Sequence, residues 1–153
     1  YEILIGLVGS EMCIRDSQML TAAGYVVEET MILPDEAKAL KAQLIRMADG
    51  RQVNLVLTTG GTGFSPRDIT PEATCAVADR NAPGIAEAMR YHSLSITPRG
   101  MLSRGVSVLR GKTLIVNLPG SPKAVQENLE YILPSLEHGV RIAAGLDGEC
   151  ARK

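Results

Sequence analysis

Aromatic residues are scarce in this sequence, which contains four Tyr, one Phe and no Trp. A hydrophobic core must therefore be built from aliphatic residues and Met, and no pair of aromatic rings is placed to stack nucleic-acid bases. The formal net charge is only -1, from 16 basic and 17 acidic residues. Because nucleic-acid polymers are bound by strongly basic surfaces, we expect no nucleic-acid partner.

Cysteine, histidine and long apolar runs are also few. The three cysteines, Cys13, Cys75 and Cys150, are widely spaced and form no CxxC motif. This spacing argues against a disulfide framework or a zinc site and favours a reducing, cytoplasmic compartment. The two histidines, His92 and His138, are isolated and are better explained as surface residues than as ligands. No apolar run approaches the roughly 20 residues of a membrane span, so we expect no membrane partner.

The sequence contains alternating strand and helix patterns and is short enough for a single domain over residues 1–153. Runs rich in aliphatic or β-branched residues predict strands at residues 3–8, 25–33, 53–58, 106–109 and 113–118. Apolar residues at helical spacing predict helices that begin near residues 35, 70 and 121, and others that cover residues 18–23 and 85–91. Such alternation is typical of an α/β fold, and we predict a three-layer α/β/α sandwich with a mostly parallel sheet.

Three of the predicted helices have recognisable start signals. Asp35 precedes one helical pattern, and Thr70 is followed by Pro71 at the start of the next. Ser121 precedes Pro122 at the start of the last helix. Asp, Thr and Ser are frequent N-cap residues, and Pro is favoured in the first helical turn, so we expect Asp35, Thr70 and Ser121 to be N-caps. Residues 95–104 match no regular pattern.

Ligands of open α/β sheets bind outside the carboxyl ends of the strands. Three loops directly follow predicted strands, at residues 34–35, 60–68 and 119–122. If the strands are parallel, all three loops lie at one edge of the sheet. The sequence therefore predicts a binding site at this edge.

The first candidate binding segment is a glycine-containing loop at residues 58–63, TTGGTG. Glycines allow a sharp turn and let backbone amides approach an anion closely, and threonine hydroxyls can add hydrogen bonds. The loop matches neither the P-loop pattern, because no Gly-Lys-Ser/Thr follows, nor GxGxxG. A phosphate-binding loop and a simple tight turn are equally good interpretations of this segment.

The second candidate segment is NLPGSP at residues 117–122, which runs from a strand into a helix. The free amides and positive dipole end of a helix N-terminus form a natural phosphate site. Considered alone, this segment is better explained as a well-capped helix start.

Two acidic residues follow strands on the predicted edge, Asp35 and Asp68. A carboxylate beside a phosphate is unfavourable unless a cation lies between them, so the pair indicates Mg²⁺. The alternatives are an N-cap for Asp35 and, for Asp68, a turn residue or an ion pair with Arg67. Ser103 and Arg104 could hold a ligand phosphate, although a solvent-exposed arginine is the more ordinary interpretation.

Four segments together resemble the molybdopterin-binding, gephyrin-type family. They read LTTGGTGFSPRDITPEAT at residues 57–74, PGIAEAMR at 83–90, MLSR at 101–104 and NLPGSPKAV at 117–125. The resemblance covers about residues 18–140. It implies an α/β sandwich that forms homotrimers and takes part in molybdenum cofactor biosynthesis. Members transfer AMP from Mg²⁺-bound ATP to the terminal phosphate of molybdopterin and release pyrophosphate.

The resemblance also implies roles for individual residues. Asp35 and Asp68 match the family's essential aspartates, as catalytic residues and Mg²⁺ ligands. The implied substrate-binding residues come from the two loops and the MLSR segment: Thr59, Gly60, Gly61, Thr62, Gly63, Ser65, Arg67, Ser103, Pro119, Gly120, Ser121 and Pro122. A downstream molybdenum-insertion protein is an implied partner. The alternative is a non-catalytic molybdopterin-binding or scaffold domain of the same fold.

The sequence departs from the family pattern at residues 9–17, GSEMCIRDS. After the first strand the family has a Ser-Asp-Arg segment, then a loop with an aspartate and a Ser-Gly pair. The segment here is shorter and lacks these features. We hypothesise that residues 9–17 are foreign sequence that arose from a sequencing or assembly artefact. If the segment is genuine, part of the nucleotide-side pocket wall and of the first helix is missing.

Overall fold

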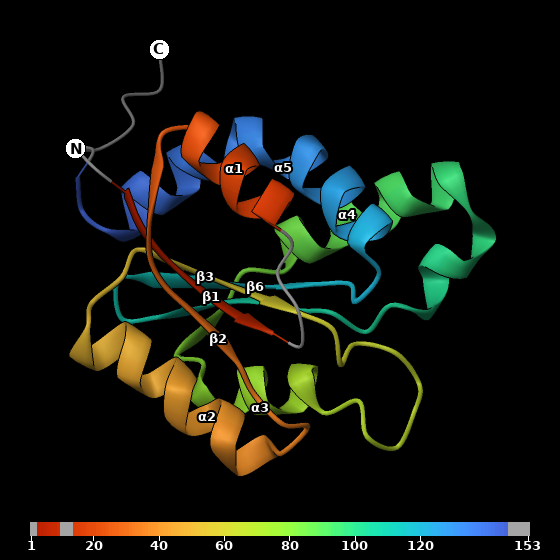
Figure 1. The fold of residues 1–153 in the computed structure, drawn as a ribbon, viewed down its shortest axis with the longest axis horizontal. Coiled ribbons are helices and arrows are strands. Elements are labelled where there is room, and N and C mark those ends of the chain that lie inside the picture. Colours follow the sequence, from red (N-terminus) through yellow and green to blue (C-terminus); the bar gives the residue numbers. More distant parts are fainter. Residues whose placement is uncertain (1–2, 10–13, 147–153) are drawn as a thin grey trace.

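A computed structural model describes residues 3–9 and 14–146 and shows a six-stranded sheet between two layers of helices within that part of the chain (Figure 1). The strands are β1 (Ile3–Gly9), β2 (Tyr25–Ile32), β3 (Leu55–Thr59), β4 (Arg80–Asn81), β5 (Ser107–Arg110) and β6 (Thr113–Leu118). Their spatial order is β2-β1-β3-β6-β5-β4. β2, β1, β3 and β6 run parallel, whereas β5 is antiparallel to both β6 and β4. The predicted mostly parallel sheet is confirmed.

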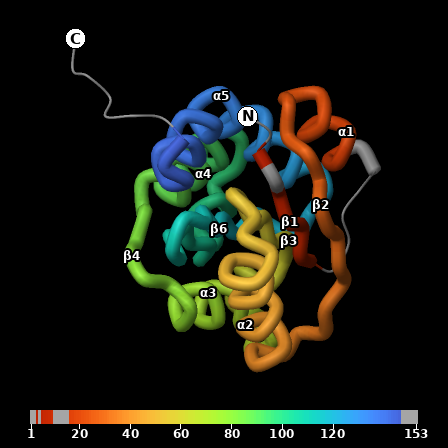
Figure 2. The backbone as a smooth tube through the Cα atoms, turned by 90° about the vertical axis from the view of Figure 1, so that its left-hand side faces the viewer, coloured from red at the N-terminus to blue at the C-terminus, as the bar shows by residue number. Residues whose placement is uncertain are grey.

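Helices cover both faces of this sheet, as predicted (Figures 1 and 2). One face carries α1 (Ile14–Ala22), α4 (Pro83–Ile96) and α5 (Pro122–Ala143). The other carries α2 (Ala37–Ile45), which continues into a π-helical turn, η1 (Arg46–Gly50), and α3 (Thr70–Val77). A 3₁₀ turn, η2 (Pro98–Leu102), follows α4. The previously unassigned residues 95–104 therefore contain the end of α4 and this turn.

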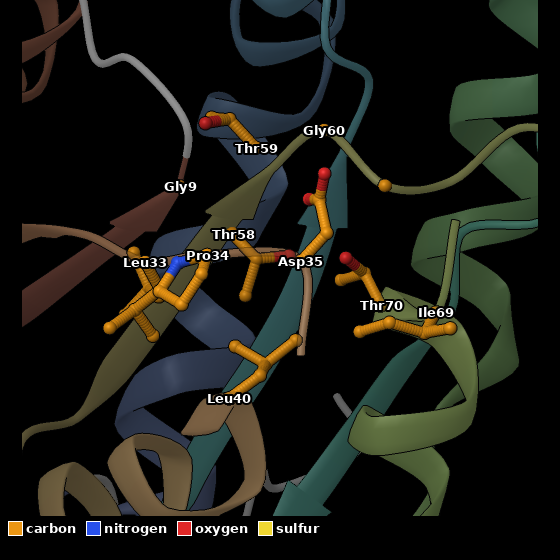
Figure 3. A pocket seen from close by; sticks show the side chains of 12 residues that line it. Gly9, Leu33, Pro34, Asp35, Leu40, Thr58, Thr59, Gly60, Ile69 and Thr70 are labelled. Carbon is orange, nitrogen blue, oxygen red and sulfur yellow. The ribbon is translucent and has the colours of Figure 1, made fainter. Parts of the chain in front are cut away.

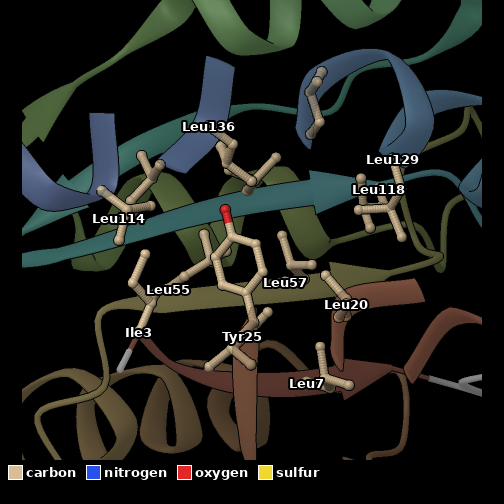
Figure 4. Packing of buried hydrophobic residues seen from close by; sticks show 14 of the residues in the cluster. Ile3, Leu7, Leu20, Tyr25, Leu55, Leu57, Leu114, Leu118, Leu129 and Leu136 are labelled. Carbon is tan, nitrogen blue, oxygen red and sulfur yellow. The ribbon is translucent and has the colours of Figure 1, made fainter. Parts of the chain in front are cut away.

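Alternate residues of the central strands point into two separate cores. In β3, Leu55 and Leu57 join the core beneath α1, α4 and α5, whereas Val56 joins the core against α2 and α3. The larger core is almost entirely aliphatic, with Tyr25 among its leucines (Figure 4). Because successive side chains of a strand point to opposite faces, the continuous apolar runs of β1, β3 and β6 satisfy both cores at once.

Two of the three expected N-caps are wrong. The backbone amide of Leu40 donates to the Glu36 carbonyl at 3.0 Å, so α2 begins after Glu36 rather than after Asp35. Ile69 likewise precedes α3, so Thr70 is already a helical residue. Ser121 is confirmed as the N-cap of α5, because its Oγ accepts a hydrogen bond from the Ala124 amide at 3.1 Å. Sequence preferences identify the turn in which a helix starts more reliably than the residue.

The atypical segment falls partly within the described residues. Gly9 ends β1 and pairs with Thr59 of β3, and residues 14–17 form the first turn of α1. Residues 10–13 lie outside the described part of the chain. The hypothesis that residues 9–17 are foreign to the family stays a prediction. Among the described residues, no helix has the length and apolar character needed to cross a membrane.

Candidate functional site

The carboxyl ends of the parallel strands meet at one edge of the sheet, and the loops that follow them come together there. The Gly60 amide donates to the Leu118 carbonyl at 3.1 Å, which joins the loop after β3 to the end of β6. A Cβ built on Gly120 would lie 3.3 Å from the Gly60 Cα. The two phosphate-loop candidates are therefore neighbours, as the predicted topology required.

The loop after β2 meets the glycine loop at a cavity of about 40 Å³ (Figure 3). Its lining includes Asp35, Thr59, Gly60, Gly61 and Thr70. The Asp35 side chain is exposed and points toward the turn at Gly60 (Figure 3). It makes no hydrogen bond or ion pair with any described residue. Because Asp35 caps no helix, its carboxylate is available to a ligand.

Thr59 also lines this cavity, and its buried hydroxyl points away from Asp35 (Figure 3). Its side chain is 5% exposed, and its Oγ1 has no hydrogen-bond partner among the described residues. Gly9 lies directly beside it, and a side chain at position 9 would overlap that oxygen. Leaving such a group unpaired costs about 1–3 kcal/mol.

The backbone of the glycine loop requires glycine at two consecutive positions. Gly60 and Gly61 have φ values of 83° and 69°, in the left-handed region that disfavours other residues. The Gly61 carbonyl accepts a hydrogen bond from the Thr70 amide at 3.1 Å, which holds the loop against the start of α3. A Cβ on Gly61 would overlap the Thr70 hydroxyl. The interpretation of the loop as a tight turn is confirmed, and Gly60 and Gly61 also line the small cavity that Asp35 shares. That the loop binds a phosphate stays a prediction.

Asp68 faces a second, wide cavity of about 470 Å³ whose lining includes Phe64, Ser65, Glu72 and Arg104. Its Oδ2 accepts a hydrogen bond from the Ser65 amide at 3.0 Å, and its own amide donates to the Ser65 carbonyl at 2.9 Å. The interpretation of Asp68 as a turn residue is therefore confirmed. An ion pair between Asp68 and Arg67 is absent from the described part of the chain. Asp35 and Asp68 line different cavities on the two sides of one loop.

Ser103 lies in a third, small cavity of about 20 Å³ together with Pro119, Arg90 and Asn117. Its Oγ accepts a hydrogen bond from the Gly105 amide at 3.3 Å. The Arg104 guanidinium is half-buried and bonded to the Gly63 and Asp68 carbonyls, so Arg104 is not a freely solvent-exposed arginine. That it holds a ligand phosphate stays a prediction. An ion pair with Glu72 completes its contacts, and the hydrogen bond from Arg104 lowers the pKa of Glu72 below its usual range.

Asn117 begins the second candidate segment and lines the third cavity, although it was not among the predicted site residues. It is 1% exposed, and its Nδ2 donates to the hydroxyls of Thr58 at 2.9 Å and Thr74 at 3.0 Å. Its Oδ1 accepts from the Val106 amide at 3.1 Å. One amide therefore connects β6 to β3, to α3 and to the segment before β5. The available signal was a single amide among the apolar residues at the end of this strand, since buried polar groups require partners.

The donor set fits Mg²⁺ better than a softer metal. No group of three or more His, Cys, Asp or Glu side chains converges within residues 3–9 and 14–146, which argues against a protein-only metal cage there. Mg²⁺ typically binds one or two carboxylates and completes its coordination with water and substrate phosphates. The unpaired Asp35 carboxylate beside the glycine loop meets that requirement.

Comparisons with known proteins agree on one family. The family described as "Probable molybdopterin binding domain" matches residues 17–138. The chain is 52% identical over 104 residues to the molybdopterin adenylyltransferase of Haemophilus influenzae, a match that covers 68% of this chain and 53% of that protein. The chain thus spans about half the length of the curated relatives it matches first.

Two solved structures share the whole fold. The molybdopterin biosynthesis enzyme MoaB of Thermus thermophilus is 40% identical, with a TM-score of 0.81, and the match covers 95% of this chain and 97% of that one. The molybdopterin biosynthesis Mog protein of Mycobacterium ulcerans is 34% identical, with a TM-score of 0.85, over 95% of this chain and 99% of that one. The predicted fold family is confirmed.

Proposed function

Since this chain belongs to the family of molybdopterin-binding domains, we propose that it adenylylates molybdopterin with ATP in molybdenum cofactor biosynthesis. The products are adenylyl-molybdopterin and pyrophosphate. The observation that carries the proposal is the cavity at the carboxyl edge of the sheet, where the unpaired Asp35 carboxylate points toward the glycine loop. A relative named molybdopterin adenylyltransferase supports the choice of reaction.

The reaction is a direct displacement. A terminal phosphate oxygen of molybdopterin attacks the α-phosphorus of ATP, and the bond from that phosphorus to the oxygen bridging to the β-phosphate breaks. Pyrophosphate leaves with the electron pair. Such a transfer requires positioning and charge stabilisation rather than a protein nucleophile.

The two loops bind and orient the phosphates. Gly60 and Gly61 shape the turn beside the small cavity that Thr59 also lines. The Gly60 amide is bonded to the Leu118 carbonyl, so the Gly61 amide is the one left for a phosphate, and Thr62, Gly63, Ser65 and Arg67 continue this loop toward the second cavity. At the other loop, Pro119 and Gly120 lead to the N-terminus of α5, which attracts anions through its dipole. Ser121 has its Oγ bound to the Ala124 amide, so Ser121 acts there mainly by shaping the helix start beside Pro122.

Asp35 is the stronger candidate to hold Mg²⁺, because its carboxylate has no partner among the described residues whereas Asp68 is bonded to Ser65. Mg²⁺ at this position would offset the charge of the substrate phosphates. Asp68 then orients the Ser65 turn and leaves its second carboxylate oxygen facing the wide cavity.

The test is incubation of the purified chain with molybdopterin, Mg²⁺ and ATP labelled at the α-phosphate, followed by detection of labelled pterin. We expect product, and we expect Asp35→Asn and Asp68→Asn each to reduce turnover at least about 100-fold with an unchanged fold. The matched control is Asp49→Asn. Asp49 lies in η1, outside the three cavities, and its substitution removes an exposed ion pair with Arg110 of β5. Near-normal turnover in Asp68→Asn would contradict its catalytic role.

The alternative is a domain of the same fold that binds molybdopterin or serves as a scaffold without catalysis. Molybdopterin binding without labelled product would favour it, or would indicate a damaged nucleotide side caused by residues 9–17. Replacing that segment with one of the family pattern separates these two, because only a damaged site would regain activity.

Self-association is part of the proposal, as a homotrimer. Large apolar side chains are exposed along α4 and η2, among them Tyr91 at 76% and Met101 at 63%. Exposed apolar surface of this kind is typical of contacts between subunits. Sedimentation velocity should show trimers that Tyr91→Glu weakens, whereas a monomeric wild-type chain would contradict this part.

Compartment and partner complete the proposal. We place the reaction in the cytoplasm, where ATP is available and an exposed free thiol such as that of Cys75 stays reduced. The adenylylated product would pass to a downstream molybdenum-insertion protein.

A further inference from the structure

Arg104 is joined by three hydrogen bonds to backbone carbonyls of the loop between β3 and α3, which runs from Gly60 to Ile69 and begins with the glycine residues. Its own amide donates to the Thr62 carbonyl at 2.8 Å. Its Nε donates to the Gly63 carbonyl and its Nη2 to the Asp68 carbonyl, each at 2.7 Å. These bonds span 36 to 42 residues of sequence, so they are tertiary contacts rather than local turns.

The same guanidinium reaches the helix that follows the loop. Its Nη1 forms an ion pair with Glu72 in the first turn of α3. One planar group thus fixes the start of the loop, its end and the next helix. The geometry suits arginine, whose five N–H donors lie in a rigid fork, and not lysine, which has a single nitrogen.

The segment that carries Arg104 is itself held by a second arginine. Arg90 of α4 donates from Nη1 to the Gly105 carbonyl at 2.6 Å and to the Ser103 carbonyl at 3.5 Å. The contacts therefore run from α4 through this segment to the glycine loop.

Asp68 is the residue that this arrangement positions. The Arg104 bond to the Asp68 carbonyl lies at the same residue whose carboxylate closes the Ser65 turn. A Cβ on Gly63 would lie 2.8 Å from the Asp68 Oδ2, so the loop packs closely against this carboxylate. Moving either carbonyl would therefore move the carboxylate.

We propose that Arg104 is a positioning residue that acts through Asp68, holding the loop in the geometry that adenylyl transfer requires, rather than a group that binds substrate phosphate. The activity part of this inference rests on the proposed function, whereas the loop-ordering part does not. Misplacement of a reacting group by about 1 Å can reduce a rate about 100-fold.

Arg104→Lys and Arg104→Met separate the two roles. A phosphate-binding residue acts as a charge, which lysine retains, whereas the fork-shaped contacts are lost in both variants. We expect both to reduce kcat about 100-fold, with a smaller change in KM for ATP and molybdopterin. The control is Arg141→Lys, which keeps an ion pair with Glu137 but lies in α5, outside the lining of the three site cavities.

Two further measurements complete the test. Amides of residues 61–68 should exchange with solvent at least about 10-fold faster in both Arg104 variants, whereas those of β3 and β6 keep their protection. In the double variant Arg104→Met with Asp68→Asn, kcat should fall no further than in Asp68→Asn alone. Both changes remove the same contribution, that of the correctly placed Asp68 carboxylate.

The inference is overturned if Arg104→Lys retains most of the wild-type kcat, if loop exchange is unchanged, or if the double variant shows additive losses. A wild-type chain without adenylylation activity would contradict the proposed function only, and the exchange measurement would still decide whether Arg104 orders the loop.

Discussion

The Tyr25→Phe variant should be at least as stable as wild type near neutral pH. At high pH it should also escape the loss of stability that ionisation of Tyr25 causes in wild type. Tyr25 is 3% exposed at the start of β2, and its hydroxyl has no hydrogen-bond partner among the described residues. Burial raises its pKa from 10.0 to about 12, the negative Glu137 adds to the rise, and Arg141 opposes it. An unpaired buried hydroxyl costs about 1–3 kcal/mol, which the phenylalanine variant avoids.

The sign of the pH effect follows from the direction of the shift. The folded state favours the neutral phenol, so this contribution to stability is complete below the unfolded pKa of 10.0. As the pH rises from 10.0 toward about 12, the unfolded chain ionises first and the contribution is lost. A difference of about two pKa units corresponds to roughly 2.7 kcal/mol at 1.36 kcal/mol per unit.

The assay is urea-induced unfolding of both proteins at a series of pH values from about 8 to about 11.5. Other groups ionise in this range, so the measured quantity is the difference between wild type and variant. The free energy of unfolding of Tyr25→Phe, relative to that of wild type, should rise by roughly 2 kcal/mol from the lowest to the highest pH of the series. Tyr131→Phe is the control, because Tyr131 is 44% exposed and lies in α5, outside the α4 and η2 surface proposed for self-association. Parallel curves for wild type and Tyr25→Phe would refute the reasoning.

Two further substitutions test the site. Gly61→Ala should destabilise more than Gly111→Ala, because both glycines have positive φ, which costs alanine about 1–2 kcal/mol, but only Gly61 faces an overlap, with Thr70. Thermal unfolding of the two variants measures the difference, and equal losses would contradict the packing argument. Asn117→Ala should cost about 2–4 kcal/mol of unfolding free energy, since it leaves two threonine hydroxyls and one amide of the buried network without this partner. A loss below about 1 kcal/mol would show that these groups find other partners.

The sequence by itself determined the layers of the fold and the edge that carries the site. Continuous apolar runs identified the strands buried on both faces, and helical spacing identified their covering helices. Because parallel strands end at one edge, the order of elements was enough to bring the loops at Asp35, Gly60 and Pro119 together. This part was predictable because it depends on local pattern and topology, which sequence periodicity reports directly.

Tertiary structure decided how individual side chains are used. Asp35 has the preferred identity for an N-cap, yet the first helical hydrogen bond closes at Glu36 and leaves the Asp35 carboxylate available. Arg104 has the charge to bind a phosphate, yet carbonyls more than 35 residues away in sequence take up its donors. A residue type specifies what a side chain can bond, whereas long-range packing decides which partners lie within reach.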